Sequence, residues 1–401
     1  MKRVDFRFDA DGQLALQRIW LICLLLPLGV AGEVAWSTPS NLAVEVEPSI
    51  FPTPVKADGA FHVLYELHVT NLSRRELHLL EIDVTDASAQ RLVAQYKAES
   101  LIAALGAPGA AAHGGDKRVI GAGLSETIFM DIVAKTRAAI PDVLLHRIVF
   151  EPIVGLSESD RTISGIRVTV RPQEPMVLGP PLRGGDWVAS HALSNSSEHR
   201  RSIVFVDGHG WLAQRFAIDW LRIGANGLAF RDDPAENASW APYGAEVLAV
   251  ANGLISDLRD GVRENDPTSE AKAVPINLET ASGNYIIIDL GGGRYAFYAH
   301  LQPGSLRVYV GDHVKAGQTI ALLGNSGNAD APHLHFQVMD RNSPLAAEGL
   351  PYVFHRFTVE GTLPSLNLIA DGKGWRPQAG SADVRVDELP TENEVIDFGG
   401  R

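Results

Sequence analysis

The sequence is poor in cysteine and in basic clusters. Its one cysteine, Cys23, lies in an apolar segment near the N-terminus, so a chain cut after residue 31 would need no disulfide chemistry. The 48 acidic side chains outnumber the 35 basic ones and give a net charge of −13, which argues against a nucleic-acid binder. No internal repeat is present.

The N-terminus has the pattern of an export signal. Residues 1–18 contain four basic side chains, and residues 19–31 are then almost wholly apolar and end in small residues. Thirteen apolar positions are too few for a comfortable membrane span, so an uncleaved anchor is the second interpretation. The bulky Ile22 before Cys23 argues against a lipoprotein signal. We therefore expect a signal peptide over residues 1–31 and an exported protein of the periplasm or cell envelope.

The pattern of residues 41–171 predicts a β-sandwich, immunoglobulin-like in kind, that serves as a spacer or partner-binding module. Runs rich in β-branched and aromatic residues, separated by polar turns, occupy residues 61–71, 78–84, 144–150 and 163–171. Residues 172–199 are rich in Pro, Gly and Ser and predict a linker. Residues 371–401 contain few large apolar groups and predict a disordered tail.

Residues 200–357 predict a second all-β domain, built on an antiparallel sheet. Short strands are expected at residues 203–206, 246–250, 285–290, 295–299 and 319–323. The glycines at 291–293 indicate a hairpin turn. The polar residues 261–283 predict a long surface loop that borders a binding groove.

Residues 331–338 read as a strand that carries two histidines on one face. Its apolar side chains alternate with His333, His335 and Gln337. Histidines at i and i+2 of a strand lie about 6.6 Å apart. One imidazole can then bind a metal while the other reaches a group bound to the same metal.

Four motifs give this signal a specific context. They are YAHL at 298–301, VGDHVKAGQ at 310–318, GNSGN at 324–328 and PHLHF at 332–336. In this order and spacing the chain resembles the catalytic domain of lysostaphin-type zinc metalloendopeptidases (LytM domain), over residues 203–353. The resemblance implies a zinc-dependent hydrolase that cuts peptide cross-links of bacterial peptidoglycan.

Carried over position by position, the resemblance assigns roles to four residues. His335 and Asp219 correspond to zinc ligands, and His300 and His333 correspond to the two histidines that assist the chemistry. Three N and O ligands would leave a fourth position for water. The family's other ligand is a histidine four residues before the aspartate, where this chain has Arg215.

Arg215 cannot be a zinc ligand, because a guanidinium has no free lone pair and stays charged. It either pairs with Asp219 in place of the metal or points away while another histidine supplies the nitrogen. His209, between two glycines, is the first candidate for that substitute ligand, and His199 is the second.

Three functions therefore stand at the level of sequence. The first is an exported zinc metalloendopeptidase acting on peptidoglycan peptides. The second is a metal-free LytM-like module that binds cell wall or regulates another wall hydrolase. The third is a structural β-protein of the envelope whose histidines have no chemical role.

Overall fold

Residues 42–169 fold as two antiparallel sheets around one core. The computed structural model describes residues 42–106, 115–152, 155, 157–370, 373–377, 380 and 383–400. The expected signal peptide and Cys23 lie outside these residues. Pro39–Arg401 form one compact unit. None of the helices in the described part of the chain has the length and apolarity needed to cross a membrane.

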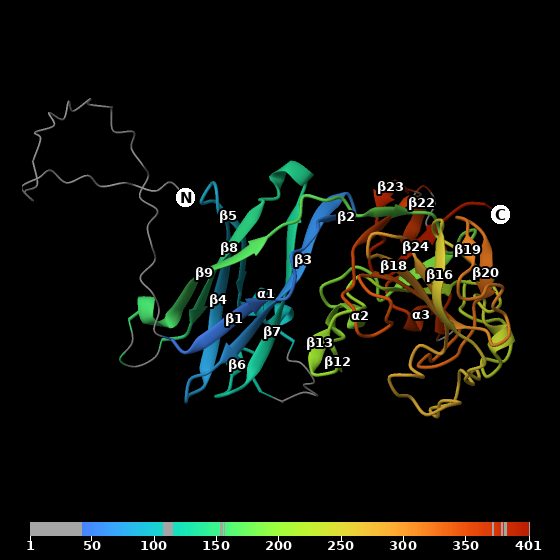
Figure 1. The fold of residues 1–401 in the computed structure, drawn as a ribbon, viewed down its shortest axis with the longest axis horizontal. Helices are drawn as coiled ribbons and strands as arrows, with labels where there is room; N and C mark the ends of the chain where they lie inside the picture. The colour runs from blue at the N-terminus through green and yellow to red at the C-terminus, as the bar shows by residue number, and fades with distance from the viewer. Residues whose placement is uncertain are drawn as a thin grey trace, which may run out of the picture. The chain divides into compact units, whose positions relative to one another are not determined.

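The two sheets alternate along the chain (Figure 1). The first contains four strands among the described residues: β1 (Val44–Pro48), β2 (Val55–Ala57), β3 (Ala60–Asn71) and β7 (Ser125–Ala134). The second contains β4 (Leu77–Asp86), β5 (Leu92–Lys97), β6 (Val119–Ile120), β8 (Val143–Phe150) and β9 (Thr162–Thr169). The helix α1 (Ala98–Ala104) and the short 3-10 turns Arg137–Ala139 and Ser159–Arg161 connect them.

Alternation of apolar side chains explains the packing of this sandwich. Val63, Tyr65 and Leu67 of β3 are fully buried against Ile82 of β4 and Ile148 of β8, in a cluster that both sheets share. Each such side chain stabilises the fold by about 1.5–3 kcal/mol. The four strands predicted in this region are confirmed as β3, β4, β8 and β9.

A large sheet organises the rest of the chain. Among the described residues it has eleven strands, in the order β10-β22-β24-β11-β14-β21-β18-β17-β16-β19, with β23 beside β22. Its strands are β10 (Met176–Leu178), β11 (Trp187–Ser190), β14 (Ile218–Arg222), β16 (Gly253–Arg259), β17 (Asn284–Asp289), β18 (Tyr295–Leu301), β19 (His313–Val314), β21 (Leu334–Met339), β22 (Tyr352–Thr362), β23 (Asp383–Glu388) and β24 (Glu394–Asp397).

Shorter elements flank this sheet. They are α2 (Glu198–Arg201), β12 (Val204–Val206), β13 (His209–Trp211), the 3-10 turn Asn237–Ser239, β15 (Glu246–Leu248), β20 (Thr319–Leu322) and α3 (Asn367–Ala370). All pairings in the large sheet are antiparallel except that of β10 with β22. The predicted loop at residues 261–283 holds no helix or strand, and the hairpin at 291–293 joins β17 to β18. The all-β fold class is confirmed.

Two segments differ from the sequence prediction. The expected linker, residues 172–199, contains β11, an interior strand that pairs with both β14 and β24. The expected disordered tail contains β23 and β24, whose Val395 and Ile396 are fully buried. The linker prediction rested on Pro, Gly and Ser content and the tail prediction on the scarcity of large apolar groups, whereas a few apolar side chains placed at alternating positions suffice for a strand within a sheet.

Candidate metal centre

Two neighbouring strands bring Asp219 and His335 together. Asp219 of β14 is the register partner of His335 of β21. Their sequence neighbours Ile218, Trp220 and Phe336 are fully buried in the core, so alternation turns Asp219 and His335 to the other face of the sheet. There Asp219 Oδ1 lies 2.9 Å from His335 Nδ1.

Gln337 determines which nitrogen of His335 carries its proton. The amide nitrogen of Gln337 faces the carbonyl of Pro344 at 3.4 Å and the sulfur of Met339 at 3.5 Å, so its Oε1 accepts from His335 Nε2 at 2.9 Å. A neutral His335 then has its lone pair on Nδ1, aimed at the carboxylate oxygen of Asp219. Two lone pairs at 2.9 Å repel unless a cation lies between them. A hydrogen bond to the far nitrogen, like the one to Gln337, is what orients a histidine for metal binding.

His199 brings a third donor to the same point. Its Nε2 lies 3.3 Å from Asp219 Oδ2, and its ring packs edge-on against that of His335 with 4.8 Å between centroids. The other nitrogen of His199 is buried and has no hydrogen-bond partner among the described residues. Ligand atoms of His199, Asp219 and His335 all lie within 4.8 Å of one another. Two imidazoles and one carboxylate form a donor set that fits zinc.

The electrostatics of Asp219 favour its charged form. Its side chain is only 15% exposed, and burial alone would raise its pKa. The imidazoles of His199 and His333 outweigh burial and hold the pKa of Asp219 well below its ordinary value. Asp219 is therefore a carboxylate anion at neutral pH, which could offset part of a divalent charge.

His300 reaches the site from β18 through a distortion of that strand. The register between β17 and β18 shifts between Asn284 and Ile286, and His300 has a φ of 62°, which is strained for a residue with a side chain. The Nδ1 of His300 donates to the carbonyl of Ser326 at 2.8 Å, which leaves a lone pair on Nε2. Burial, together with the nearby imidazoles of His333 and His335, lowers the pKa of His300 well below its ordinary value.

His333 precedes β21 and lies beside both Asp219 and His300. Its Nδ1 donates to the carbonyl of Ala331 at 2.8 Å, and its Nε2 lies 3.5 Å from Asp219 Oδ1. The rings of His333 and His300 are 4.7 Å apart. Burial lowers the pKa of His333, but the charge of Asp219 outweighs it and the net shift is upward. The structure thus brings together the four residues predicted for the site.

These side chains line a cavity of about 460 Å³. Its walls also include His191, Glu198, Gln214, Asn328 and Leu345. Part of this wall comes from the loop at residues 261–283, through Ala281 and Ser282, as expected for a loop that borders a groove. The cavity is large enough to hold a segment of a peptide.

Arg215 and His209 lie away from the metal-binding group. Arg215 is buried and bonds to Glu66 and Glu348 rather than to Asp219. His209 of β13 is exposed and packs edge-on against Trp211, with 4.2 Å between ring centroids, and it does not line the cavity. His199, the second candidate from the sequence, is the histidine that approaches Asp219. The glycines beside His209, which made it the first candidate, belong to a separate hairpin formed by β12 and β13.

Comparison with known proteins agrees with this geometry. Residues 239–347 match the model of Peptidase family M23, a range that contains His300, His333 and His335, whereas His199 and Asp219 precede it. The chain therefore carries an M23 peptidase domain of the lysostaphin type.

Similar proteins come from two bacteria. The peptidoglycan DD-endopeptidase ShyA of Vibrio cholerae is 38% identical over 183 residues, which cover 43% of this chain and 39% of ShyA. Lysostaphin of Staphylococcus simulans is 48% identical over 92 residues, 23% of this chain and 16% of lysostaphin. This chain thus aligns with less than two fifths of either relative. The solved catalytic domain of lysostaphin is 22% identical over 42% of this chain and 88% of that domain, with a TM-score of 0.22.

Proposed function

We propose that the M23 peptidase domain of this chain is a zinc-dependent endopeptidase that hydrolyses peptide bonds of bacterial peptidoglycan. The single observation that carries this proposal is the opposition of Asp219 Oδ1 and His335 Nδ1 at 2.9 Å, with Gln337 holding the proton of His335 on the far nitrogen. His199, whose Nε2 lies 3.3 Å from Asp219 Oδ2, completes a set of donors that fits zinc.

His199, Asp219 and His335 would hold the metal, in place of a set that used His209. Three protein ligands would leave a fourth coordination position for water. Zinc bound there would supply a water of lowered pKa and polarise the carbonyl of the bond to be cut.

His300 and His333 are placed to move protons. Each donates its Nδ1 proton to a backbone carbonyl at 2.8 Å, so each presents Nε2 as the free nitrogen. A neutral Nε2 can accept the proton of the attacking water, and a protonated one can donate to the oxyanion or the leaving amine. The lowered pKa of His300 keeps it neutral near pH 7, the form that accepts a proton. The raised pKa of His333 favours its protonated form, which donates one.

The substrate assignment follows the relatives. ShyA is a peptidoglycan DD-endopeptidase, and the match to it supports a peptide of the cell wall as the substrate of this chain. Such a substrate lies outside the cytoplasm, which agrees with the export signal expected at residues 1–31.

The test is metal content together with digestion of purified peptidoglycan sacculi. We expect about one zinc per chain, release of cross-linked peptide fragments, loss of both after treatment with 1,10-phenanthroline, and recovery on addition of Zn²⁺. Substoichiometric zinc with no fragment release, combined with retention of the protein on sacculi, would contradict this function and favour the metal-free wall-binding or regulatory module.

A further inference from the structure

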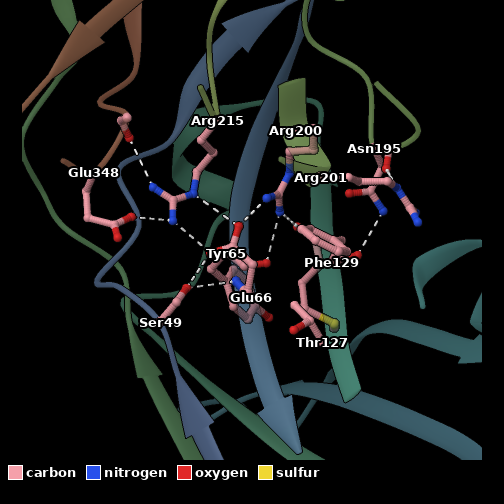
Figure 2. Close-up of polar contacts among 12 residues, drawn as sticks. Ser49, Tyr65, Glu66, Thr127, Phe129, Asn195, Arg200, Arg201, Arg215 and Glu348 are labelled. Carbon is pink, nitrogen blue, oxygen red and sulfur yellow. Dashed lines mark hydrogen bonds and ion pairs between the residues drawn. The ribbon is translucent and has the colours of Figure 1, made fainter. Parts of the chain in front are cut away.

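Glu66 occupies an unusual position in the sandwich. It lies in the middle of β3 and is fully buried, as is the Arg200 side chain that contacts it. Its carboxylate accepts hydrogen bonds from Arg200, from Ser49 and from two nitrogens of Arg215, at 3.1 and 2.8 Å for the latter. Figure 2 shows the two guanidinium groups approaching this one carboxylate from opposite sides.

The charges of this network balance. Arg215 also contacts Glu348 at 2.6 Å, so two carboxylates neutralise two guanidinium groups in the described structure. Burial alone would raise the pKa of Glu66, but Arg215 and Arg200 outweigh it and hold that pKa far below its ordinary value. Moving or removing one side chain of this network would leave a buried charge unpaired, which is strongly destabilising. The four charged side chains are therefore held in one arrangement.

The network is attached directly to a proposed metal ligand. Arg200 follows His199 in the chain, and its Nη2 donates to the carbonyls of Tyr65 at 3.1 Å and Met130 at 3.3 Å. The next residue, Arg201, donates to the carbonyl of Leu105 at 2.9 Å. The guanidinium groups of Arg200 and Arg201 both lie 5.0 Å from the ring centroid of Phe129. These contacts all belong to the sandwich, from β3, β7 and the residue after α1.

The helix that carries His199 cannot fix its own position. α2 has four residues, and a single turn is unstable in isolation because few hydrogen bonds offset the ordering of its backbone. The hydroxyl of its N-cap, Ser197, donates to the carbonyl of His191 and accepts no capping hydrogen bond from the backbone of α2. Asp219 and His335, by contrast, are held by paired strands.

We propose that Glu66 positions His199 for the metal through Arg200, so that the β-sandwich is a structural part of the metal centre. This inference rests on the proposed function, because it requires His199 to be a ligand. It replaces the interpretation of residues 41–171 as a spacer. Arg215 acts in the same network and not at the metal.

The experiment compares two buried carboxylates in the full chain. Glu66→Gln removes the charge that Arg200 contacts. The control is Glu388→Gln, because Glu388 of β23 accepts from Lys56 of β2 at 2.9 Å and thus joins the same two regions without touching α2. Zinc affinity is measured by competition with a chromophoric chelator, and coordination by the visible spectrum of the Co²⁺-loaded protein.

We expect Glu66→Gln to weaken the binding of zinc about 10- to 100-fold, the range typical of losing a group that supports a metal ligand. It should also alter the Co²⁺ spectrum. Glu388→Gln should retain wild-type affinity and spectrum. Equal effects of the two variants, or wild-type affinity in Glu66→Gln, would overturn the inference. Absence of zinc from the wild-type protein would instead overturn the proposed function itself.

A second variant covers the case in which Glu66→Gln does not fold. Arg200→Lys keeps the charge opposite Glu66 but loses the two hydrogen bonds to the carbonyls of Tyr65 and Met130. The Arg200→Lys protein should fold, and its affinity for zinc should be about 10-fold weaker than that of the wild type, the lower end of the same range. A folded Arg200→Lys protein with unchanged zinc affinity and an unchanged Co²⁺ spectrum would overturn the inference.

Discussion

The two sides of the proposed metal centre are built differently. Asp219 and His335 project from neighbouring strands of a long sheet, and the hydrogen bonds and core side chains of that sheet hold them. His199 projects from a single helical turn that is held by a buried ion network with the sandwich. The same site thus combines ligands fixed by local regular structure with one fixed by contacts between residues more than a hundred positions apart.

The largest effect is expected on the strand side. His335→Ala should remove zinc from the protein and lower kcat/KM on peptidoglycan fragments by about 10³-fold or more, because metal catalysis supplies several kcal/mol of the barrier reduction. Zinc analysis and fragment release measure this change. His355→Ala is the matched control, since His355 is exposed and pairs only with Asp387 among the described residues. An active His335→Ala protein would contradict the assignment of His335 as a zinc ligand.

His199→Ala should have a smaller effect, about 10²-fold in kcat/KM or some 3 kcal/mol. Asp219 and His335 remain in place on their strands and can retain a loosely bound zinc. Added imidazole should restore part of the activity of His199→Ala but not that of His335→Ala. If His209→Ala abolished zinc binding and His199→Ala did not, then His199 would not be the third ligand, and the contrast between a ligand on a helix and ligands on strands would be wrong.

How far the sequence could predict the site follows the same division. Alternation in residues 331–338 identified the face that carries His333, His335 and Gln337, because side-chain direction in a strand is a local property. The resemblance added Asp219 and His300. The role of Gln337 was missed, although its place on the histidine face was visible in the sequence.

The glycines on both sides of His209 favoured it over His199, but local backbone freedom does not report which histidine approaches Asp219. The position of His199 depends on Arg200 meeting Glu66, 134 residues earlier, and neither residue has a local signal. The linker and tail predictions failed for a related reason: β11, β23 and β24 gain their stability from neighbouring strands rather than from their own composition.

The network should matter for folding as well as for the metal. Arg215→Ala should lower the free energy of unfolding by about 3–5 kcal/mol, because it leaves the buried Glu66 with a single guanidinium partner. Urea denaturation measures this. Arg259→Ala, which removes a surface pair with Glu279, should change it by at most about 1 kcal/mol. A loss in Arg215→Ala no larger than that control would show that the network does not join the two regions.

The smallest effect concerns the sandwich beside Arg201. Burial raises the pKa of Glu126 on β7 to about 7, above the ordinary value of 4.5. The folded state therefore binds the proton more tightly than the unfolded state, and stability declines as pH rises from about 4.5 through 7. Glu126→Gln removes this dependence and should be more stable than wild type by about 1–2 kcal/mol at pH 8 and equal to it near pH 4. Thermal unfolding at the two pH values checks the sign.

The most direct test of the account is the structure of the zinc-loaded full chain, with anomalous scattering recorded at the zinc edge. The account predicts one zinc bound by His199, Asp219 and His335, with Gln337 on the far nitrogen of His335 and Arg215 still paired with Glu66. Zinc bound through His209, or a His199 directed away from an occupied site, would contradict it.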